Sequence, residues 1–264
     1  MNQGPAPGEV WLVGAGPGDP GLLTLRAASA LRVADIVFHD ALPGRAVLAM
    51  ARADATLQNV GKRKGNVPWP QERINAALIE AARAGQRVVR LKGGDPLLFG
   101  RGGEELLALA AAGIPVDVVP GVSSASAAAA VLRMPLTHRG AASAVSFVTG
   151  HDFSGKLPAN IDWDALAKTG GTIVAFMALS RLDQIALRLL AAGLPAGTPV
   201  AIIARASLSG QALLRSTLGT CTLDARRAAL PTPALVVIGA VAGMADISAV
   251  TIHHDIKETV HVSS

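Results

Sequence analysis

The chain has 264 residues, of which 50% are hydrophobic and 16% are charged, so it can bury the cores of one large or two modest domains. The 24 basic and 19 acidic residues give a net charge of +5, and with 3% aromatic residues this balance argues against a nucleic-acid partner. No apolar run is long enough to span a bilayer and the N-terminus has no secretory pattern, so we expect a cytoplasmic protein that does not bind a membrane. No Cys/His cluster has the spacing of a metal site, so we expect no metal.

Short apolar strands alternate with Ala- and Leu-rich helices along the first half of the chain. Strands are predicted at 9–16, 35–40, 87–96 and 115–121, and helices at 22–34, 69–85, 103–113 and 123–134. In the first of these helices, one face carries Leu22, Leu25, Ala28 and Leu31, which we expect to be buried. The alternation predicts an α/β domain with a mostly parallel sheet, in which ligands lie beyond the carboxyl ends of the strands.

The pattern starts again after residue 140 and is richer in strands. Strands are predicted at 143–151, 170–179, 198–207, 212–220 and 232–241, with a helix at 181–193. We therefore expect an N-terminal α/β domain over residues 1–138, a second α/β domain over 139–245, and a C-terminal tail over 246–264 without helical periodicity.

The stretch "VGAGPGDPGLLT", residues 13–24, follows the first predicted strand and raises the question of a phosphate-binding loop. The dinucleotide fingerprint G-x-G-x-x-G needs a third glycine where Asp19 stands, and Pro17 has no N–H to offer a phosphate. No Gly-Lys-Ser/Thr follows, which excludes a Walker loop. The loop suits close backbone packing against a flat, neutral group; the alternative is a strand-to-helix turn without a ligand.

A second glycine-rich stretch, "RLKGGDPLLFGRGGEE" at 90–105, is more specific. With it and the first loop, further motifs follow in order: "VGKRKG" (60–65), "QERIN" (71–75), "VVPGVSSASAAAA" (118–130), "PLTHRG" (135–140) and "VTGH" (148–151). In this set the chain resembles the tetrapyrrole methyltransferase family over roughly residues 10–243, and within it the branch that methylates uroporphyrinogen III.

The resemblance implies two α/β domains with the active site in the cleft between them, and a homodimer. It implies S-adenosyl-L-methionine as methyl donor and S-adenosyl-L-homocysteine as its product. The substrate would be uroporphyrinogen III, methylated at two pyrrole carbons to give precorrin-2 through precorrin-1, on the route to sirohaem and cobalamin. No dehydrogenase or chelatase module precedes the motifs, so we expect the stand-alone enzyme.

The resemblance also assigns the donor site, residue by residue. The donor-binding positions fall on Pro17, Gly93, Gly94, Asp95, Leu98, Ser123, Ser124, Met177 and Ala206. Such a site needs no phosphate cradle, because the donor carries no phosphate; it needs backbone groups, a polar acceptor and an apolar wall. Asp95 as a turn-capping residue and Met177 as a core residue are the alternatives.

The resemblance places the acid–base pair on Asp40, as a base, and on Lys62, as a proton donor. A solvated loop lysine is the alternative for Lys62. The acidic substrate calls for basic contacts, for which the candidates are Arg63, Lys64, Arg101, His138 and Arg139. The chain departs from the family pattern after "GKRKG", where it lacks the usual histidine and has Trp69 nearby.

Two other functions remain open at this point. One is a sister methylase that acts on a later precorrin or cobalt-precorrin. The other is a nucleotide-binding oxidoreductase, or a binding module, that uses the first glycine loop; the broken fingerprint argues against it.

Overall fold

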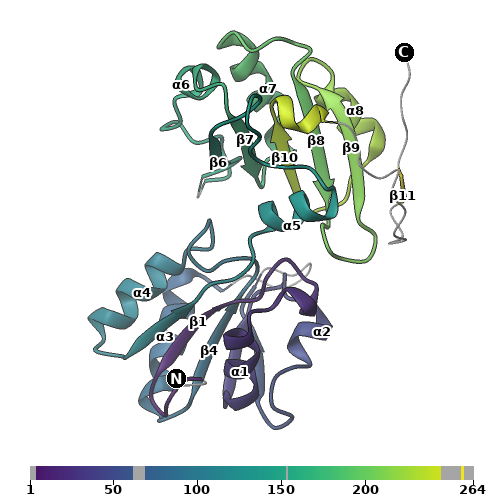
Figure 1. The fold of residues 1–264 in the computed structure, drawn as a ribbon. Helices are drawn as coiled ribbons and strands as arrows, with labels where there is room; N and C mark the ends of the chain where they lie inside the picture. Colours follow the sequence, from purple (N-terminus) through teal and green to yellow (C-terminus); the bar gives the residue numbers. More distant parts are fainter. Residues whose placement is uncertain (1–3, 62–68, 153, 245–256, 259–264) are drawn as a thin grey trace. The chain divides into compact units, whose positions relative to one another are not determined.

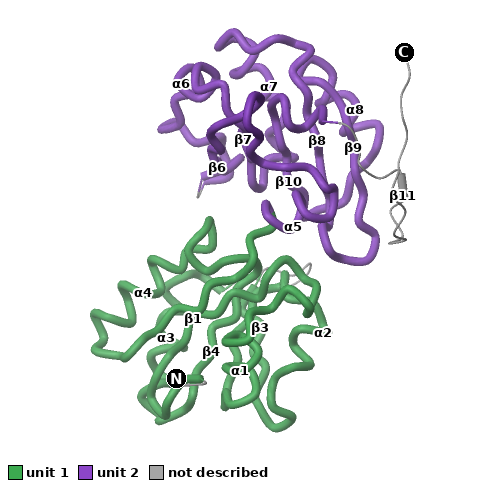
Figure 2. Tube along the Cα trace, in the orientation of Figure 1, with its two compact units in different colours: residues 1–124 green, residues 125–264 purple. Residues whose placement is uncertain are grey.

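The computed structural model describes residues 4–61, 69–152, 154–244 and 257–258. It divides into two compact units, Met1–Ser124 and Ala125–Ser264 (Figure 2). The division falls before the expected boundary at 138/139 because helix α5 (Ser124–Val131) packs Ala125 and Ala128 into the core of the second unit. Among the described residues, no helix is both long and apolar enough to cross a membrane.

The first unit, with β1 and β4 labelled in Figure 1, contains a five-stranded sheet of order β3-β2-β4-β1-β5. Every pair of neighbouring strands in it is parallel. Its strands are β1 (Val10–Gly14), β2 (Ile36–His39), β3 (Thr56–Asn59), β4 (Val88–Lys92) and β5 (Val116–Val119). The helices are α1 (Leu25–Val33), α2 (Arg45–Leu48), α3 (Gln71–Arg83) and α4 (Gly102–Ala111), with a 3-10 turn η1 (Pro20–Leu22). The predicted parallel α/β domain is confirmed.

Both faces of this sheet are covered, because alternate residues of a strand point to opposite sides. Trp11 and Val13 of β1 pack in the cluster that contains α1, whereas Leu12 packs with Leu78 of α3 and Leu109 of α4. The expected burial of Leu25 is wrong: its side chain is 89% exposed. Helix α1 begins only at this residue, after the N-cap of Thr24, and its buried residues are Ala27, Ala28, Ala30 and Leu31.

The second unit contains a mixed sheet of order β11-β9-β8-β10-β7-β6. Its strands are β6 (Val145–Thr149), β7 (Thr172–Phe176), β8 (Pro199–Ala204), β9 (Ala212–Thr217), β10 (Ala234–Ile238) and β11 (Lys257–Glu258). Strand β10 runs antiparallel to both β7 and β8, and β6 runs parallel to β7. The carboxyl ends of β6, β7 and β8 therefore lie at one edge of this sheet.

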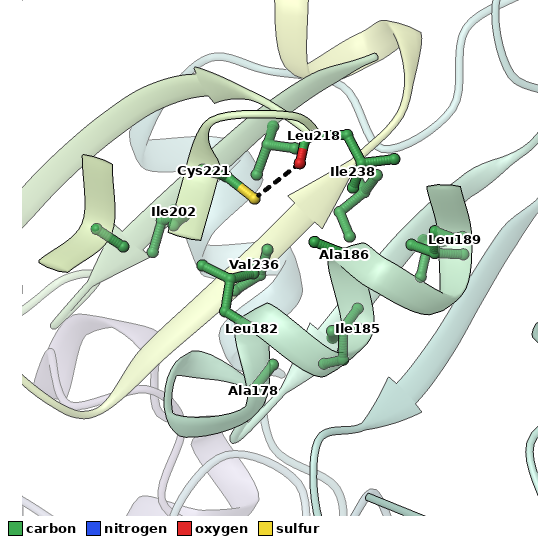
Figure 3. Close-up of a cluster of buried hydrophobic side chains, with 14 of the residues drawn as sticks. Ala178, Leu182, Ile185, Ala186, Leu189, Ile202, Leu218, Cys221, Val236 and Ile238 are labelled. Carbon is green, nitrogen blue, oxygen red and sulfur yellow. Dashed lines mark hydrogen bonds between the residues drawn. The ribbon is translucent and has the colours of Figure 1, made fainter. Parts of the chain in front are cut away.

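Helices cover both faces of the second sheet as well. Besides α5, they are α6 (Trp163–Lys168), α7 (Leu182–Ala191) and α8 (Cys221–Ala228), with the 3-10 turns η2 (Leu179–Arg181) and η3 (Ala240–Gly243). Figure 3 shows how α7 packs Leu182, Ile185 and Leu189 near Val236 and Ile238 of β10. Cys221 lies in this core, where its Sγ donates to Leu218 O at 3.5 Å, and burial raises the pKa of its thiol. It is a packing residue and not a reactive thiol.

Three loops at the carboxyl edge of the first sheet meet backbone to backbone, at a place we call the glycine junction (Gly14, Gly16, Gly94 and Gly121). Gly16 N donates to Gly94 O at 3.2 Å, and Gly94 N donates to Gly16 O at 2.8 Å. A Cβ added to Gly121 would lie 2.1 Å from Gly94 O and 2.8 Å from Gly14 Cα, so no side chain fits there. The glycines at or just after the ends of β1, β4 and β5 thus allow the close approach of these segments.

The opposite, amino-terminal edge carries an ion pair between β2 and β4. The Asp35 carboxylate accepts from Arg87 N at 2.8 Å, from Arg87 Nε at 3.0 Å and from Arg87 Nη2 at 2.8 Å. Arg52 Nη2 adds a further bond at 3.1 Å. These bonds, chiefly those from the Arg87 side chain, hold the pKa of Asp35 far below its usual range.

We predict that Gly121→Ala lowers the free energy of unfolding by about 1–3 kcal/mol, the usual cost of overpacking a tight site. The measurement is urea denaturation of the full chain. Gly103→Ala is the matched control, because a Cβ there would meet no atom within 4 Å and the backbone is helical. Equal stability of the two variants would contradict the proposed crowding at the glycine junction.

We predict that Asp35→Asn removes a part of the stability that depends on pH. The folded-state pKa of Asp35 is depressed, so its contribution is fully present above the unfolded-state value of about 3.9 and is lost as the pH falls below it. The variant should therefore be less stable than the parent at pH 7, and the difference should shrink progressively below about pH 4. Thermal denaturation at several pH values checks this; a difference independent of pH would count against it.

Candidate functional site

Most of the predicted site residues of the first unit follow strands of the parallel sheet. Asp40 follows β2, Pro17 lies in the loop after β1, and Gly93, Gly94 and Asp95 follow β4. Ser123 and Ser124 come after β5. Because the carboxyl ends of parallel strands share one edge, the fold brings these residues to the same edge of the sheet, where open α/β sheets bind ligands.

Both oxygens of the Asp95 carboxylate contact the backbone of neighbouring loops. Oδ1 accepts from Leu97 N at 2.9 Å, and Oδ2 accepts from Gly121 N at 3.1 Å. Asp95 therefore caps its own turn and also ties the loop after β4 to the loop after β5. Gly16 and Gly94 already bond the loop after β1 to the loop after β4, so the two glycine-rich motifs form one structural element.

The loop that continues from Asp95 to α4 has an unusual backbone. Phe99 and Arg101 both have positive φ angles, 53° and 58°, which L-residues seldom adopt. Leu98, a predicted donor contact, is half-buried, and its N donates to Asp95 O at 3.4 Å. Strained conformations of this kind persist where the surrounding structure fixes them, often at ligand sites.

Asp40 is part of a network of charged side chains that the sequence analysis missed. Its Oδ1 accepts from Arg90 Nη2 at 2.5 Å, and Arg90 Nε donates to Glu105 Oε1 at 2.9 Å. Lys92 Nζ donates to both oxygens of Glu105, at 3.1 and 3.0 Å. Gln71 Nε2 adds a bond to Glu105 Oε1 at 3.2 Å. Asp40 is thus joined to the first turn of α4 through a buried arginine.

The four charged side chains of this network differ in their exposure to solvent. The side chains of Arg90 and Lys92 are each 3% exposed and that of Glu105 is 0% exposed, whereas Asp40 is 27% exposed. Desolvation and the charge of Arg90 lower the pKa of Lys92, against the opposing effect of Glu105. For Arg90, the carboxylates of Asp40 and Glu105 outweigh the effect of burial and raise its pKa. Arg90 therefore keeps its charge, and Asp40 alone of the four reaches solvent.

The signal for this network was present in the sequence. Arg90 and Lys92 lie two positions apart in β4, so a strand places them on one face, the face that Val88 directs toward α3 and α4. Two cations on the buried face of a central strand require a buried carboxylate. Which acidic residue provides it could not be deduced, because Glu104 and Glu105 are adjacent at the start of α4.

The predicted substrate contacts differ in their exposure and in their partners. Arg101 makes a two-bond ion pair with Glu104, at 2.7 and 2.6 Å, on the exposed surface. His138 and Arg139 are exposed and lie in a turn closed by the backbone bridge between His138 and Ala142. The remaining predictions, Lys62, Arg63 and Lys64, lie outside the described residues.

The second unit carries the last two predicted donor contacts. Met177 follows β7 and Ala206 follows β8, at the same edge of the second sheet. Met177 is 43% exposed and has a φ of 52°, and Ala206 stands between Arg205 and Ser207, with φ angles of 53° and 64°. Met177 is therefore not a core residue, which removes the packing alternative. Across the described part of the chain, no group of His, Cys, Asp and Glu side chains could hold a metal ion.

Comparisons with known proteins identify the family of this chain. The family model of the tetrapyrrole (corrin/porphyrin) methylases matches residues 9–222. The chain is 48% identical to a uroporphyrinogen-III C-methyltransferase of Sinorhizobium sp., over 89% of this chain and 84% of that relative. It is also 48% identical to siroheme synthase 2 of Aeromonas hydrophila, over 90% of this chain but only 50% of the relative, so it spans about half of that protein.

A solved structure gives the same result at the level of the fold. The uroporphyrin-III C-methyl transferase of Thermus thermophilus, complexed with S-adenyl homocysteine, superposes with a TM-score of 0.76 at 40% identity, covering 88% of this chain and 98% of that one. The extent of these matches, together with the two joined glycine motifs, shows that this chain belongs to the tetrapyrrole methylase family.

Proposed function

We propose that this chain transfers methyl groups from S-adenosylmethionine to two pyrrole carbons of uroporphyrinogen III, giving precorrin-2 through precorrin-1. The observation that carries the proposal is the Gly16–Gly94 bridge, which places side by side the two loops that the resemblance assigns to the donor. The name of the relative from Sinorhizobium sp. and that of the solved Thermus thermophilus enzyme support the same substrate class.

The described residues fit a donor that carries no phosphate. Pro17 and the glycine junction offer backbone surface without a phosphate cradle, and Leu98 and Met177 offer apolar contact. The Ser207 Oγ beside Ala206 is buried and has no hydrogen-bond partner among the described residues, as expected of a group that a ligand satisfies. When bound, S-adenosylmethionine supplies an electrophilic methyl group on a sulfonium centre.

The protein's own contribution is mainly positioning, with one proton transfer. Holding the reacting carbon and the methyl group in line removes most of the entropic cost of a bimolecular step. Asp40, at the exposed end of its network, accepts the proton that the ring system loses after methylation. Lys62 acts as the proton donor in this proposal.

In this proposal, basic side chains bind the acidic side chains of uroporphyrinogen III. His138 and Arg139 are exposed and available, and Arg63 belongs to the same proposed set. Arg101 already pairs with Glu104, but an exposed pair contributes little free energy, so a substrate carboxylate can replace Glu104.

The proposal also includes a homodimer in the cytoplasm, and light scattering of the purified protein tests the dimer.

The direct test is incubation of the purified chain with methyl-labelled S-adenosylmethionine and uroporphyrinogen III. We expect two labelled methyl groups in each product molecule, as shown by mass spectrometry. Binding of S-adenosylhomocysteine without any transfer to uroporphyrinogen III would favour the sister methylases instead. Thermal stabilisation by NAD(P)H, without any by S-adenosylhomocysteine, would favour the oxidoreductase.

We predict that Asp40→Asn lowers kcat about 10²- to 10⁴-fold, the usual contribution of a general base, and leaves the KM for S-adenosylmethionine unchanged. The amide keeps the shape of the side chain but cannot accept the proton. Asp35→Asn is the matched control, since it alters an aspartate paired with an arginine on the same two strands, at the other edge of the sheet. Full turnover by Asp40→Asn would exclude Asp40 as the base.

A further inference from the structure

Arg90 is fixed on all sides before it reaches Asp40. Its Nε donates to Glu105 Oε1 at 2.9 Å, and its Nη1 donates to Leu91 O at 3.2 Å and Phe38 O at 3.5 Å. Only Nη2 is left for Asp40, which it contacts at 2.5 Å. A planar guanidinium with these contacts has one orientation, so the position of Nη2 is set by Glu105 and by the backbones of β2 and β4.

Glu105 is in turn fixed by three side chains. It accepts from Arg90, from Lys92 with both oxygens, and from Gln71. Gln71 is itself oriented, since its Nε2 also donates to Asn75 Oδ1 at 3.0 Å. The N-terminal turns of α3 and α4 and the central strand β4 thereby determine where the Glu105 carboxylate lies.

The backbone of Asp40 is held as well. A Cβ added to Gly61 would lie 2.4 Å from Ala41 N and 3.1 Å from Asp40 Cα, so the segment after β3 packs directly against this residue. The ring Nδ1 of the buried His39 lies 2.8 Å from Asp40 O. With the backbone fixed, the orientation of the Asp40 carboxylate depends on the bond to Arg90.

Fold stability alone does not call for this network. Strands β2 and β4 are already joined by Asp35 and Arg87, an ion pair at the amino edge that leaves both side chains partly in solvent. Buried charges are costly to desolvate, and apolar residues of similar size often replace them without loss of stability. The Glu105 network instead ends at the carboxyl edge, on its one exposed member.

We infer that Arg90 and Glu105 are positioning residues, which orient the Asp40 carboxylate toward the substrate from within the first unit. The inference rests on the proposed function only in assigning a proton-accepting role to Asp40. Neither residue touches the substrate: Glu105 is fully buried, and Arg90 is nearly so.

The kinetic test compares Arg90→Lys, Glu105→Gln and Asp40→Asn with the double variant Arg90→Lys/Asp40→Asn. Lysine keeps the charge but cannot contact Asp40 and Glu105 together, so we expect kcat to fall about 10²-fold, the effect of a misplacement of about 1 Å. The KM for S-adenosylmethionine should stay unchanged, and Glu105→Gln should lower kcat in the same direction. Because Arg90 acts through Asp40, the double variant should be no slower than Asp40→Asn alone.

A second measurement does not depend on turnover. In protein labelled with ¹³C at the aspartate carboxyl carbons, the Asp40 resonance is the one that Asp40→Asn removes. We expect it to shift in Arg90→Lys and in Glu105→Gln and to stay in place in Asp35→Asn. If the parent protein does not methylate uroporphyrinogen III, the proposed substrate fails, and this spectrum still decides whether the network orients Asp40.

Several results would overturn the inference. They are an unmoved Asp40 resonance in Arg90→Lys, additive kinetic effects in the double variant, or an Arg90→Lys enzyme that is less stable but fully active. If Glu105→Gln does not fold, Arg90→Lys still decides the outcome, since it retains the buried positive charge beside Glu105.

Discussion

The close approach of three loop backbones at the glycine junction is the constraint on which the first unit's functional edge depends. Gly94 exchanges two hydrogen bonds with Gly16, and Gly121 lies against both Gly94 and Gly14 without room for a side chain. The loops after β1, β4 and β5 are thereby fixed relative to one another. The arrangement also explains why the first glycine loop departs from a dinucleotide fingerprint, since its glycines serve contact with other loops and not with phosphate.

The buried charges beside this junction have a different purpose from those at the opposite edge. Asp35 and Arg87 are partly exposed, and exposed ion pairs adjust stability modestly and in a pH-dependent way. Arg90, Lys92 and Glu105 are desolvated, and removal of Glu105 would leave the buried ammonium group of Lys92 without its ion-pair partner. Buried ion pairs of this kind add little to the stability of a fold, but their fixed positions are well suited to orienting a reacting group.

Much of the fold was predictable, because alternating apolar strands and helices leave a clear periodic signal. The parallel first sheet was expected and is confirmed, while β3 was missed because "TLQN" is a largely polar edge strand with no apolar run. The helices α6 and α8 were also missed, because six and eight residues give little helical periodicity. The loops of the site were found from motif order, but the contact between Arg90 and Glu105 joins separate elements, and only the folded chain determines it.

In the second unit, the glycine of the "VTGH" stretch contacts the backbone beside a predicted donor contact, Met177. Gly150, in the "VTGH" stretch, has no room for a Cβ, which would lie 2.7 Å from Met177 O and 2.4 Å from Ala178 Cα. Its N also donates to Phe176 O at 2.7 Å, so the ends of β6 and β7 are joined. Met177, whose carbonyl oxygen lies at this contact, has a left-handed backbone and an exposed side chain. A side chain at position 150 would therefore displace the backbone on which the strained Met177 lies.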